Sequence, residues 1–563
     1  MRLRPLALAC ALALLAVPAS ASAAVNVTGF SVTPSTTQAG GHPDLKISTS
    51  FAASPASDDT KDLVVKFPAG LIGNPNAVPK CTTAQFGADA CPGNTAVGSV
   101  AVTAEATLAL VINQTVTSPG TVYNLPPVGA EPARLGIKIR PAAVGPLTFQ
   151  SISLVSVAKL GPETGYALET TIPNQPRTVA SSAGNVDLNI KQVDLSLRGQ
   201  PGATAFLTNP SSCAPGTFST TVVPYDSGAP SSRTAPYTAT NCAALPFSPK
   251  ASGTIGSKGR NKKGSLISLT TSFDFPAGSG SLKDSVVILP KDVTSNLDAL
   301  TRACDLVTPV ESCPATSTIG TAEAATPLLA VPLRGPVVLK KSAGGPYPSL
   351  VVSLRGAAPL TLEGKVDIAQ NRLRNNFPGA PDIPLSKFKL SIDGGKGGLL
   401  LAVDDLCRAN RANAADVRLT GWNGKTVTSK PKLAPQGCKG YKPPRPRAAA
   451  SIGRRSKTLK LRVSAGTYTR LRVVSASLPK GIAVSRKGLR GTAGKKLRGK
   501  SLRAKGRKLK ATVSRKGAAS VRLTAKRVKV SRALVGRRVK IRVAAKDDTG
   551  RTVKLTVRAR VRR

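Results

Sequence analysis

The residues with the most chemical potential in this sequence are its cysteines, and the N-terminus indicates the compartment in which they react. Arg2 and Arg4 precede an apolar run from Leu6 to Val17, which is followed by Ala21-Ser22-Ala23. This order is typical of a secretory signal peptide, which we predict over residues 1–23. The apolar run is too short to cross a bilayer, so we expect an exported, extracellular chain associated with the cell surface.

Removing that peptide removes Cys10 and leaves eight cysteines, an even number that favours disulfides in an exported chain. In each half, two cysteines 10 or 9 positions apart are followed by two that are 29 or 31 apart. Because this pattern occurs twice, we predict bridges between neighbours: Cys81–Cys91, Cys213–Cys242, Cys304–Cys313 and Cys407–Cys438. The alternative, a zinc site, needs cysteines about two to four residues apart, and no two are that close.

Other arrangements that could support catalysis or hold a cofactor are weak. His42 is the only histidine, which excludes sites that need two imidazoles. Gly494–Ser501 matches the phosphate-loop pattern G-x4-G-K-S, but its flanks are rich in Lys, Arg and Gly, so we interpret the match as composition. Trp422 fits a core position better than a sugar-stacking platform. We expect no catalytic residues, cofactor or metal, and we assign the adjacent acids to turns: Asp58-Asp59, Asp404-Asp405 and Asp547-Asp548.

The highest density of positive charge lies in the C-terminal part of the sequence. Residues 441–563 hold 41 of the 80 Lys and Arg and two acids, a net charge of 41 − 2 = +39, against 39 − 26 = +13 for residues 1–440. Three segments there, 459–463, 539–543 and 553–561, alternate apolar and polar residues, which indicates strands with one apolar and one cationic face. The outward cations that we expect to bind a polyanion are Lys460, Arg462, Lys540, Arg542, Lys554 and Arg558.

Mutual repulsion among so many like charges weakens a compact domain, so we expect anionic polymers of the cell envelope as the partner. The alternative is a solvated face that serves solubility alone. Nucleic acid would bind only non-specifically, through phosphates, because Tyr441 and Tyr468 are the only aromatic residues of this segment and offer no stacking platform.

The elements that position the cysteines come from an internal repeat. Residues 46–51 and 62–68 match residues 268–273 and 284–290 at an offset of 222. Cys91-Pro92 and Val97-Gly98 recur as Cys313-Pro314 and Ile319-Gly320 at the same offset. Within each copy, short runs of Val, Ile, Leu and Thr are interrupted by Pro and Gly, as in β-sandwiches.

We therefore predict an all-β chain: a β module at 24–243, its copy at 244–440, a Pro-rich linker at 441–448 and a basic, Ig-like β-sandwich at 449–563. A loop rich in Lys, Arg and Gly is expected near 485–511, and a short helix from Asn296 to Cys304. Two hairpin turns are expected, at 393–398 and 547–550.

The repeated signature resembles a family of uncharacterised secreted proteins of soil actinobacteria, over about residues 60–440. It rests on 131–136, 206–213, Cys313-Pro314 with Ile319-Gly320, 381–385, and Gly394-Gly395 before Leu406-Cys407. The resemblance implies repeated β modules and an extracellular or envelope setting, and no activity. The leading hypothesis is a non-enzymatic envelope protein retained on anionic polymers by its cationic domain. The alternatives are an enzyme acting on cell-wall polysaccharide and a protein-binding adhesin or scaffold.

Overall fold

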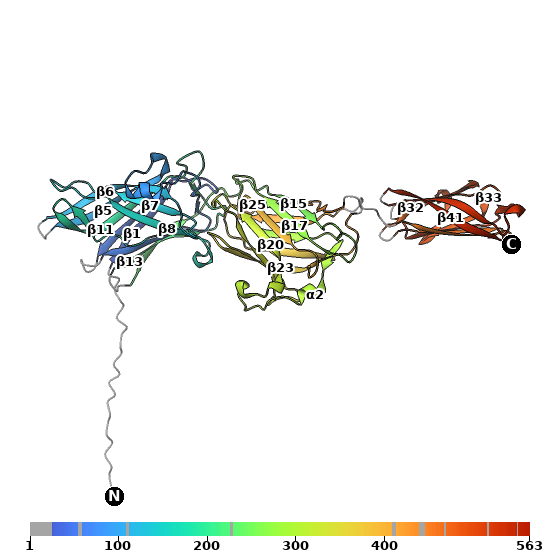
Figure 1. The fold of residues 1–563 in the computed structure, drawn as a ribbon. Helices are drawn as coiled ribbons and strands as arrows, with labels where there is room; N and C mark the ends of the chain where they lie inside the picture. Colours follow the sequence, from blue (N-terminus) through green and yellow to red (C-terminus); the bar gives the residue numbers. More distant parts are fainter. Residues whose placement is uncertain are drawn as a thin grey trace, which may run out of the picture.

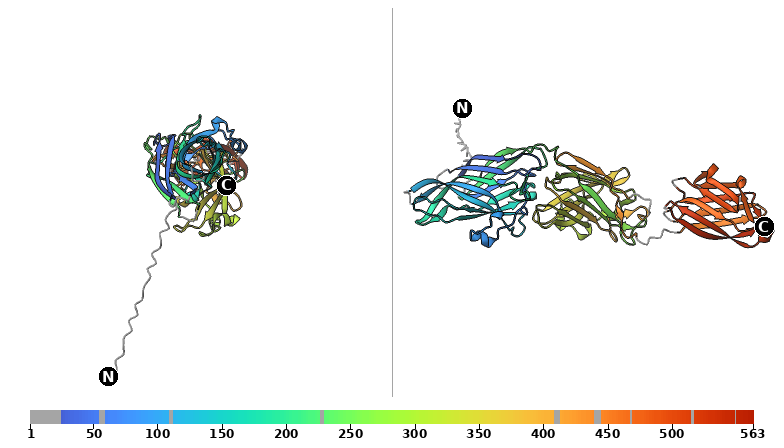
Figure 2. Two further views of the ribbon diagram at one scale, coloured as in Figure 1. Left: turned by 90° about the vertical axis from the view of Figure 1, so that its left-hand side faces the viewer. Right: turned by 90° about the horizontal axis from the view of Figure 1, so that it is seen from above.

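The computed structural model describes residues 25–53, 59–108, 112–225, 229–407, 413–438, 445–466, 469–514, 517–548 and 550–563. The predicted signal peptide and most of the predicted linker lie outside these residues. The described chain is almost entirely β, and three β bodies follow one another along it (Figure 1 and Figure 2). The predicted all-β class is confirmed.

The first body is built from residues 25–237 around one hydrophobic core. Eleven strands form one path of a single sheet, in the order β1-β2-β11-β5-β6-β7-β8-β9-β3-β13-β14, and β10 pairs with β11. β12 and β4 form a separate two-stranded sheet. The elements are β1 (Val25–Pro34), β2 (Leu45–Ala53), β3 (Thr60–Lys66), β4 (Ile72–Gly73), α1 (Thr83–Gly87), β5 (Ala96–Leu108), β6 (Ile112–Leu125), β7 (Arg134–Ile139), β8 (Ile152–Lys159), β9 (Glu169–Ile172), β10 (Thr178–Ser181), β11 (Gly184–Leu197), β12 (Leu207–Thr208), β13 (Gly216–Pro224) and β14 (Ser231–Tyr237).

The second body is built from residues 250–435 around a core of its own. Its elements are β15 (Lys250–Ile255), β16 (Leu266–Ile267), β17 (Leu269–Asp274), β18 (Leu282–Ile288), β19 (Val293–Ser295), α2 (Leu297–Leu300), β20 (Thr318–Ala325), β21 (Leu333–Lys340), β22 (Ser349–Leu354), β23 (Leu360–Ala369), β24 (Arg372–Phe377), β25 (Lys387–Ile392), β26 (Leu400–Ala402), β27 (Asp416–Gly421), β28 (Thr426–Ser429) and β29 (Ala434–Pro435).

The two bodies share one strand order. In the second sheet the order is β15-β17-β25-β20-β21-β22-β23-β24-β18-β27-β28, with β29 added beside β15. Position by position, this repeats the order of the first sheet. The corresponding strands β3 and β18 begin and end 222 positions apart, which is the offset of the sequence match. The topology therefore supports the internal repeat.

The repeated Val97-Gly98 and Ile319-Gly320 mark the same backbone feature in each copy. The register shifts between Ala96 and Gly98 where β5 pairs with β6, and between Thr318 and Gly320 where β20 pairs with β21. A Cβ atom at Gly98 would collide with the carbonyl oxygen of Ser196, and one at Gly320 with that of Ser391. A β-bulge followed by close approach of the neighbouring strand therefore requires glycine there.

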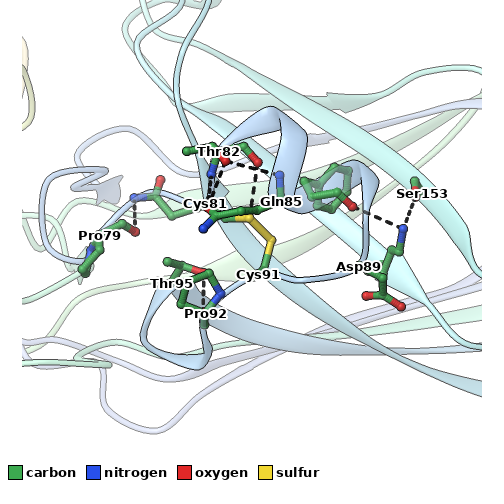
Figure 3. Close-up of a disulfide and its surroundings, with 12 residues drawn as sticks. Pro79, Cys81, Thr82, Gln85, Asp89, Cys91, Pro92, Thr95 and Ser153 are labelled. Carbon is green, nitrogen blue, oxygen red and sulfur yellow. Dashed lines mark hydrogen bonds between the residues drawn. A yellow bond between two sulfur atoms is a disulfide. The ribbon is translucent and has the colours of Figure 1, made fainter.

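The four predicted disulfides are confirmed. Their Cα–Cα distances are 5.3 Å (Cys81–Cys91), 5.9 Å (Cys213–Cys242), 5.6 Å (Cys304–Cys313) and 5.5 Å (Cys407–Cys438), which is the usual range for a bridge. The first bridge closes the loop that carries α1 (Figure 3). Thr82 and Gln85 form a capping box there, because the Thr82 hydroxyl accepts from the Gln85 N–H and the Gln85 side chain accepts from the Thr82 N–H.

Two local predictions need correction. The helix expected from Asn296 to Cys304 is shorter, since α2 covers only Leu297–Leu300. The turn at 393–398 does not close a hairpin, because the strand before it, β25, pairs with β17 and β20, whereas the strand after it, β26, pairs with β16 and β19. The turn instead carries the chain from the large sheet of the second body to its small one.

The first two bodies contact each other through hydrogen bonds and an apolar cluster. Asp382, from the second body, accepts hydrogen bonds at Oδ2 from the backbone N–H of Ser211 (2.8 Å) and Ser212 (3.1 Å) in the first. An apolar cluster drawn from both bodies packs at this contact: Ile72, Leu160, Leu328 and Ala358. Burial raises the pKa of Asp382, although its hydrogen bonds act in the opposite direction. The signature residues 206–213 and 381–385 therefore meet where the repeats join.

Candidate functional site: the cationic C-terminal sandwich

The C-terminal residues fold into two layers around one core. One layer follows the order β35-β34-β38-β31-β30 and the other β41-β40-β32-β37-β36-β33-β39, and β30 joins β41 by a short parallel pairing. The strands are β30 (Arg447–Gly453), β31 (Thr458–Ser464), β32 (Leu471–Ser477), β33 (Ile482–Ser485), β34 (Leu489–Ala493), β35 (Lys495–Leu497), β36 (Leu502–Gly506), β37 (Lys508–Thr512), β38 (Ser520–Ala525), β39 (Lys529–Val530), β40 (Arg538–Asp547) and β41 (Thr552–Arg562). β30 begins at Arg447, inside the stretch predicted as linker.

The alternating segments form strands as predicted. Along β31 and β40, apolar residues such as Leu461 and Ile541 are buried in the core, while the cations between them are exposed. β40 and β41 form the antiparallel hairpin expected around the turn at 547–550. Apolar side chains fill the space between the layers, so the cations cover the outside.

The six candidate cations are all exposed, but they do not share one face. Lys460 and Arg462 lie on β31, in the first layer, whereas the other four lie on β40 and β41, in the second. In the second layer Lys540 pairs with Arg558, and Arg542 with Thr556. The alternation of apolar and charged residues in the sequence predicts which side chains of a strand point outward. It does not predict to which layer the strand belongs.

The prediction of a loop near 485–511 is wrong, because that segment forms the strands β34, β35, β36 and β37. These strands add cations that were not predicted from the sequence, among them Lys505 and Lys508. Register places Arg542, Ser477, Lys508 and Lys505 side by side across four strands of the second layer. The sequence feature that could have predicted a strand here is the alternation of Lys508 and Lys510, which are exposed, with Leu509 and Ala511, which are buried. The high content of Lys, Arg and Gly in this segment obscured that alternation.

Like charges face each other directly across neighbouring strands of this sandwich. Five cation pairs occupy opposite positions: Arg538–Arg560, Lys540–Arg558, Lys505–Lys508, Arg503–Lys510 and Arg462–Arg522. Such pairs are destabilising. The two acids of the segment bond to backbone amides at one end, where Asp547 accepts from the Arg551 N–H (3.1 Å) and Asp548 from the Arg470 N–H (2.9 Å). The outer faces therefore carry a strong positive potential.

The phosphate-loop match lies in a surface hollow of about 600 Å³. The matching segment consists of β35 and a 3-10 turn at Gly499–Ser501, and the next element is the strand β36. A nucleotide loop needs a helix at that point. The hollow is lined by three cations, Lys495, Lys496 and Arg498, together with the hydroxyl-bearing Ser501, Thr512 and Ser514. It is suited to an anionic group and lacks the architecture of a nucleotide loop.

The remaining candidate residues have local structural roles. Asp404 Oδ1 accepts from the Asp405 N–H (2.8 Å), and Asp405 Oδ1 accepts from the Cys407 N–H (3.0 Å), which is turn chemistry. Trp422 donates its indole N–H to the Ala380 carbonyl (2.8 Å), and the Lys283 ammonium lies 4.9 Å from its ring centre. His42 Nδ1 lies 3.0 Å from the Leu207 carbonyl oxygen. Asp58 lies outside the described residues.

Within the described ranges, no group of three or more His, Cys, Asp or Glu side chains could hold a metal ion. No helix in the same ranges is long and apolar enough to cross a membrane.

Comparison with known proteins gives no family. No family model and no curated protein matches the chain. Among solved structures, the collagen-binding domain of the Erysipelothrix rhusiopathiae surface protein RspB is 11% identical, covers 54% of this chain and 92% of its own, and has a TM-score of 0.16. The N-terminal domain of the Streptococcus gordonii adhesin Sgo0707 is 9% identical, covers 96% of this chain and 91% of its own, and has a TM-score of 0.17. Similarity at this level carries no argument about function.

Proposed function

We propose that this chain is a secreted, non-enzymatic β protein that is retained on anionic polymers of the cell envelope by its C-terminal sandwich. The observation that carries the proposal is the set of like-charge pairs across neighbouring strands. Each such pair costs free energy of folding, and an anionic polymer laid over the strands would turn that repulsion into attraction. The first two bodies would then be the part held at the cell surface.

The charge distribution supports binding over an extended surface. Cations cover both layers, so a flexible polymer could contact either side, and the hollow at Lys495, Lys496 and Arg498 could seat one anionic group of it. The attraction would need no sequence-specific or stereospecific contact. Affinity should therefore depend on salt and on the linear charge density of the polymer.

A four-residue variant tests the proposal. Replacing Lys540, Arg542, Lys554 and Arg558 by Gln removes four outward charges from the second layer without touching the core. We expect the affinity for purified anionic wall polymer to fall, and the salt slope of binding to decrease by up to about four units, roughly one for each phosphate contact that is lost. Binding at a series of salt concentrations, by calorimetry or sedimentation, is the measurement.

The matched control removes four exposed lysines from the first two bodies, Lys46, Lys258, Lys263 and Lys389, also by replacement with Gln. The net charge falls equally in both variants, and the control should retain nearly full affinity. If both variants lost affinity equally, net charge alone would be responsible. If neither lost any, the second layer would not contact the polymer.

A further inference from the structure

The sheet of the first body curls until its two edge strands meet. The backbone N–H of Val27, on β1, donates to Ser231 Oγ on β14 (3.0 Å), and Arg233 Nε on β14 donates to the Val27 carbonyl (3.0 Å). The sheet path contains eleven strands. A closed barrel of about eight strands is just wide enough for side chains to fill or to hold one small ligand. A rolled sheet of eleven strands leaves more interior space.

That space is a cavity of about 110 Å³ lined almost entirely by apolar side chains of β2, β3 and β5 to β11. Several large inward residues that line it remain partly exposed, among them Ile152, Leu154, Ile190 and Val193. Apolar surface that is left uncovered forgoes roughly 25 cal/mol per Å² of favourable burial. The interior is therefore suited to an apolar guest.

Among the few polar residues that line this cavity, one has a buried side-chain donor without a partner among the described residues. Gln175 lies in the loop between β9 and β10, lines the cavity, and is 3% exposed. Its backbone N–H donates to the Lys61 carbonyl and its carbonyl accepts from the Tyr225 hydroxyl, but its side-chain Nε2 has no partner among the described residues. A buried, unpaired donor costs about 1–3 kcal/mol, and a ligand with an acceptor at that end would satisfy it.

The second body has a cavity of about 90 Å³ in the corresponding place. Five lining positions recur at an offset of 222: Ile47 and Leu269, Thr49 and Thr271, Leu63 and Ser285, Val65 and Val287, and Phe67 and Leu289. The cavity is thus a property of the repeated topology and not an isolated packing gap.

We propose that the cavity of the first body binds a small neutral acyl ester, with its hydrocarbon chain among the strands and its carbonyl oxygen at Gln175 Nε2. The ligand must be neutral because burying a carboxylate without a counter-charge is costly. The volume limits its length, because a cavity of about 150 Å³ accommodates the six carbons of benzene, so the cavity of about 110 Å³ here holds a chain of about four carbons. The proposal is independent of the C-terminal sandwich.

A series of methyl esters, from propanoate to decanoate, tests this site by calorimetry on the full chain. Each added methylene contributes about 0.8 kcal/mol of burial, so affinity should rise roughly three- to fourfold per carbon up to about pentanoate and then level off. Absence of saturable binding by any ester to folded protein would overturn the proposal.

Two variants assign the binding to this cavity. Ala104→Leu fills it and should abolish ester binding, whereas Ala84→Leu, on the exposed face of α1, should not. Gln175→Leu should lower ester affinity about three- to tenfold by removing the donor, and it should raise the melting temperature of the unliganded protein. If Ala104→Leu and Gln175→Leu both bound esters like the unaltered chain, the site would lie elsewhere and the assignment would be wrong.

Discussion

Replacing Ile541 by Asp should unfold the C-terminal sandwich, whereas the same replacement at its neighbour Lys540 should leave it folded. Ile541 is fully buried between the two layers, where it packs in the core with Leu461. An isolated carboxylate at that depth costs several kcal/mol in addition to the lost apolar burial, which is comparable with the whole stability of a small domain. Lys540 is exposed and faces Arg558, so an acid there relieves repulsion.

Thermal unfolding followed by circular dichroism and calorimetry distinguishes the two variants. The Ile541→Asp protein should lose the transition of the sandwich and keep those of the first two bodies, whose cores contain no residue of the sandwich. Equal behaviour of the two variants would mean that β40 does not present alternate faces to core and solvent.

Raising the sodium chloride concentration from about 0.05 M to 0.5 M should stabilise the C-terminal sandwich, because salt shortens the distance over which its opposed cation pairs repel. Complete removal of the repulsion in five pairs, at roughly 0.2–1 kcal/mol each, would contribute about 1–5 kcal/mol, so the stabilisation by salt should stay below about 5 kcal/mol. The first two bodies contain opposite-charge pairs such as Arg134–Glu131 and Arg140–Asp89, so their stability should change little. Calorimetry of the full chain resolves these transitions.

The variant Lys540→Thr tests whether the opposed cation pairs cause this salt dependence. Thr is a suitable replacement because Thr556 already lies opposite Arg542 in the same hairpin, so a Thr–Arg pair is tolerated there. Removing one of the five pairs should reduce the salt dependence of the sandwich's stability. A sandwich that became less stable as salt increased would show that attraction, not repulsion, dominates its surface.

Much of the fold could be predicted because it depends on local spacing. The cysteine pairs follow from separations repeated in each half, and the C-terminal strands from a strict period of two. Val97-Gly98 and Ile319-Gly320 appeared in the sequence as a repeat, and the structure adds the reason, a bulge beside a close strand.

The features that could not be predicted from the sequence are those that depend on which strands become neighbours in a sheet. The turn at 393–398 has hairpin chemistry, but its flanking strands belong to different sheets, and turn residues do not choose a partner strand. For the same reason the sequence did not assign the six cations to two layers. The helix α1 was missed although the capping-box pattern Thr82-x-x-Gln85 is visible, because the segment is only a few residues long.

The central claim is that the cationic sandwich holds the protein on anionic envelope polymers. Its most direct test is sedimentation with purified cell walls at low and high salt, comparing the full chain with a chain that lacks residues 445–563. The full chain should pellet at low salt and be released at high salt, because the attraction is screened, and the shortened chain should remain soluble at both. Equal pelleting of both chains, unaffected by salt, would contradict the account.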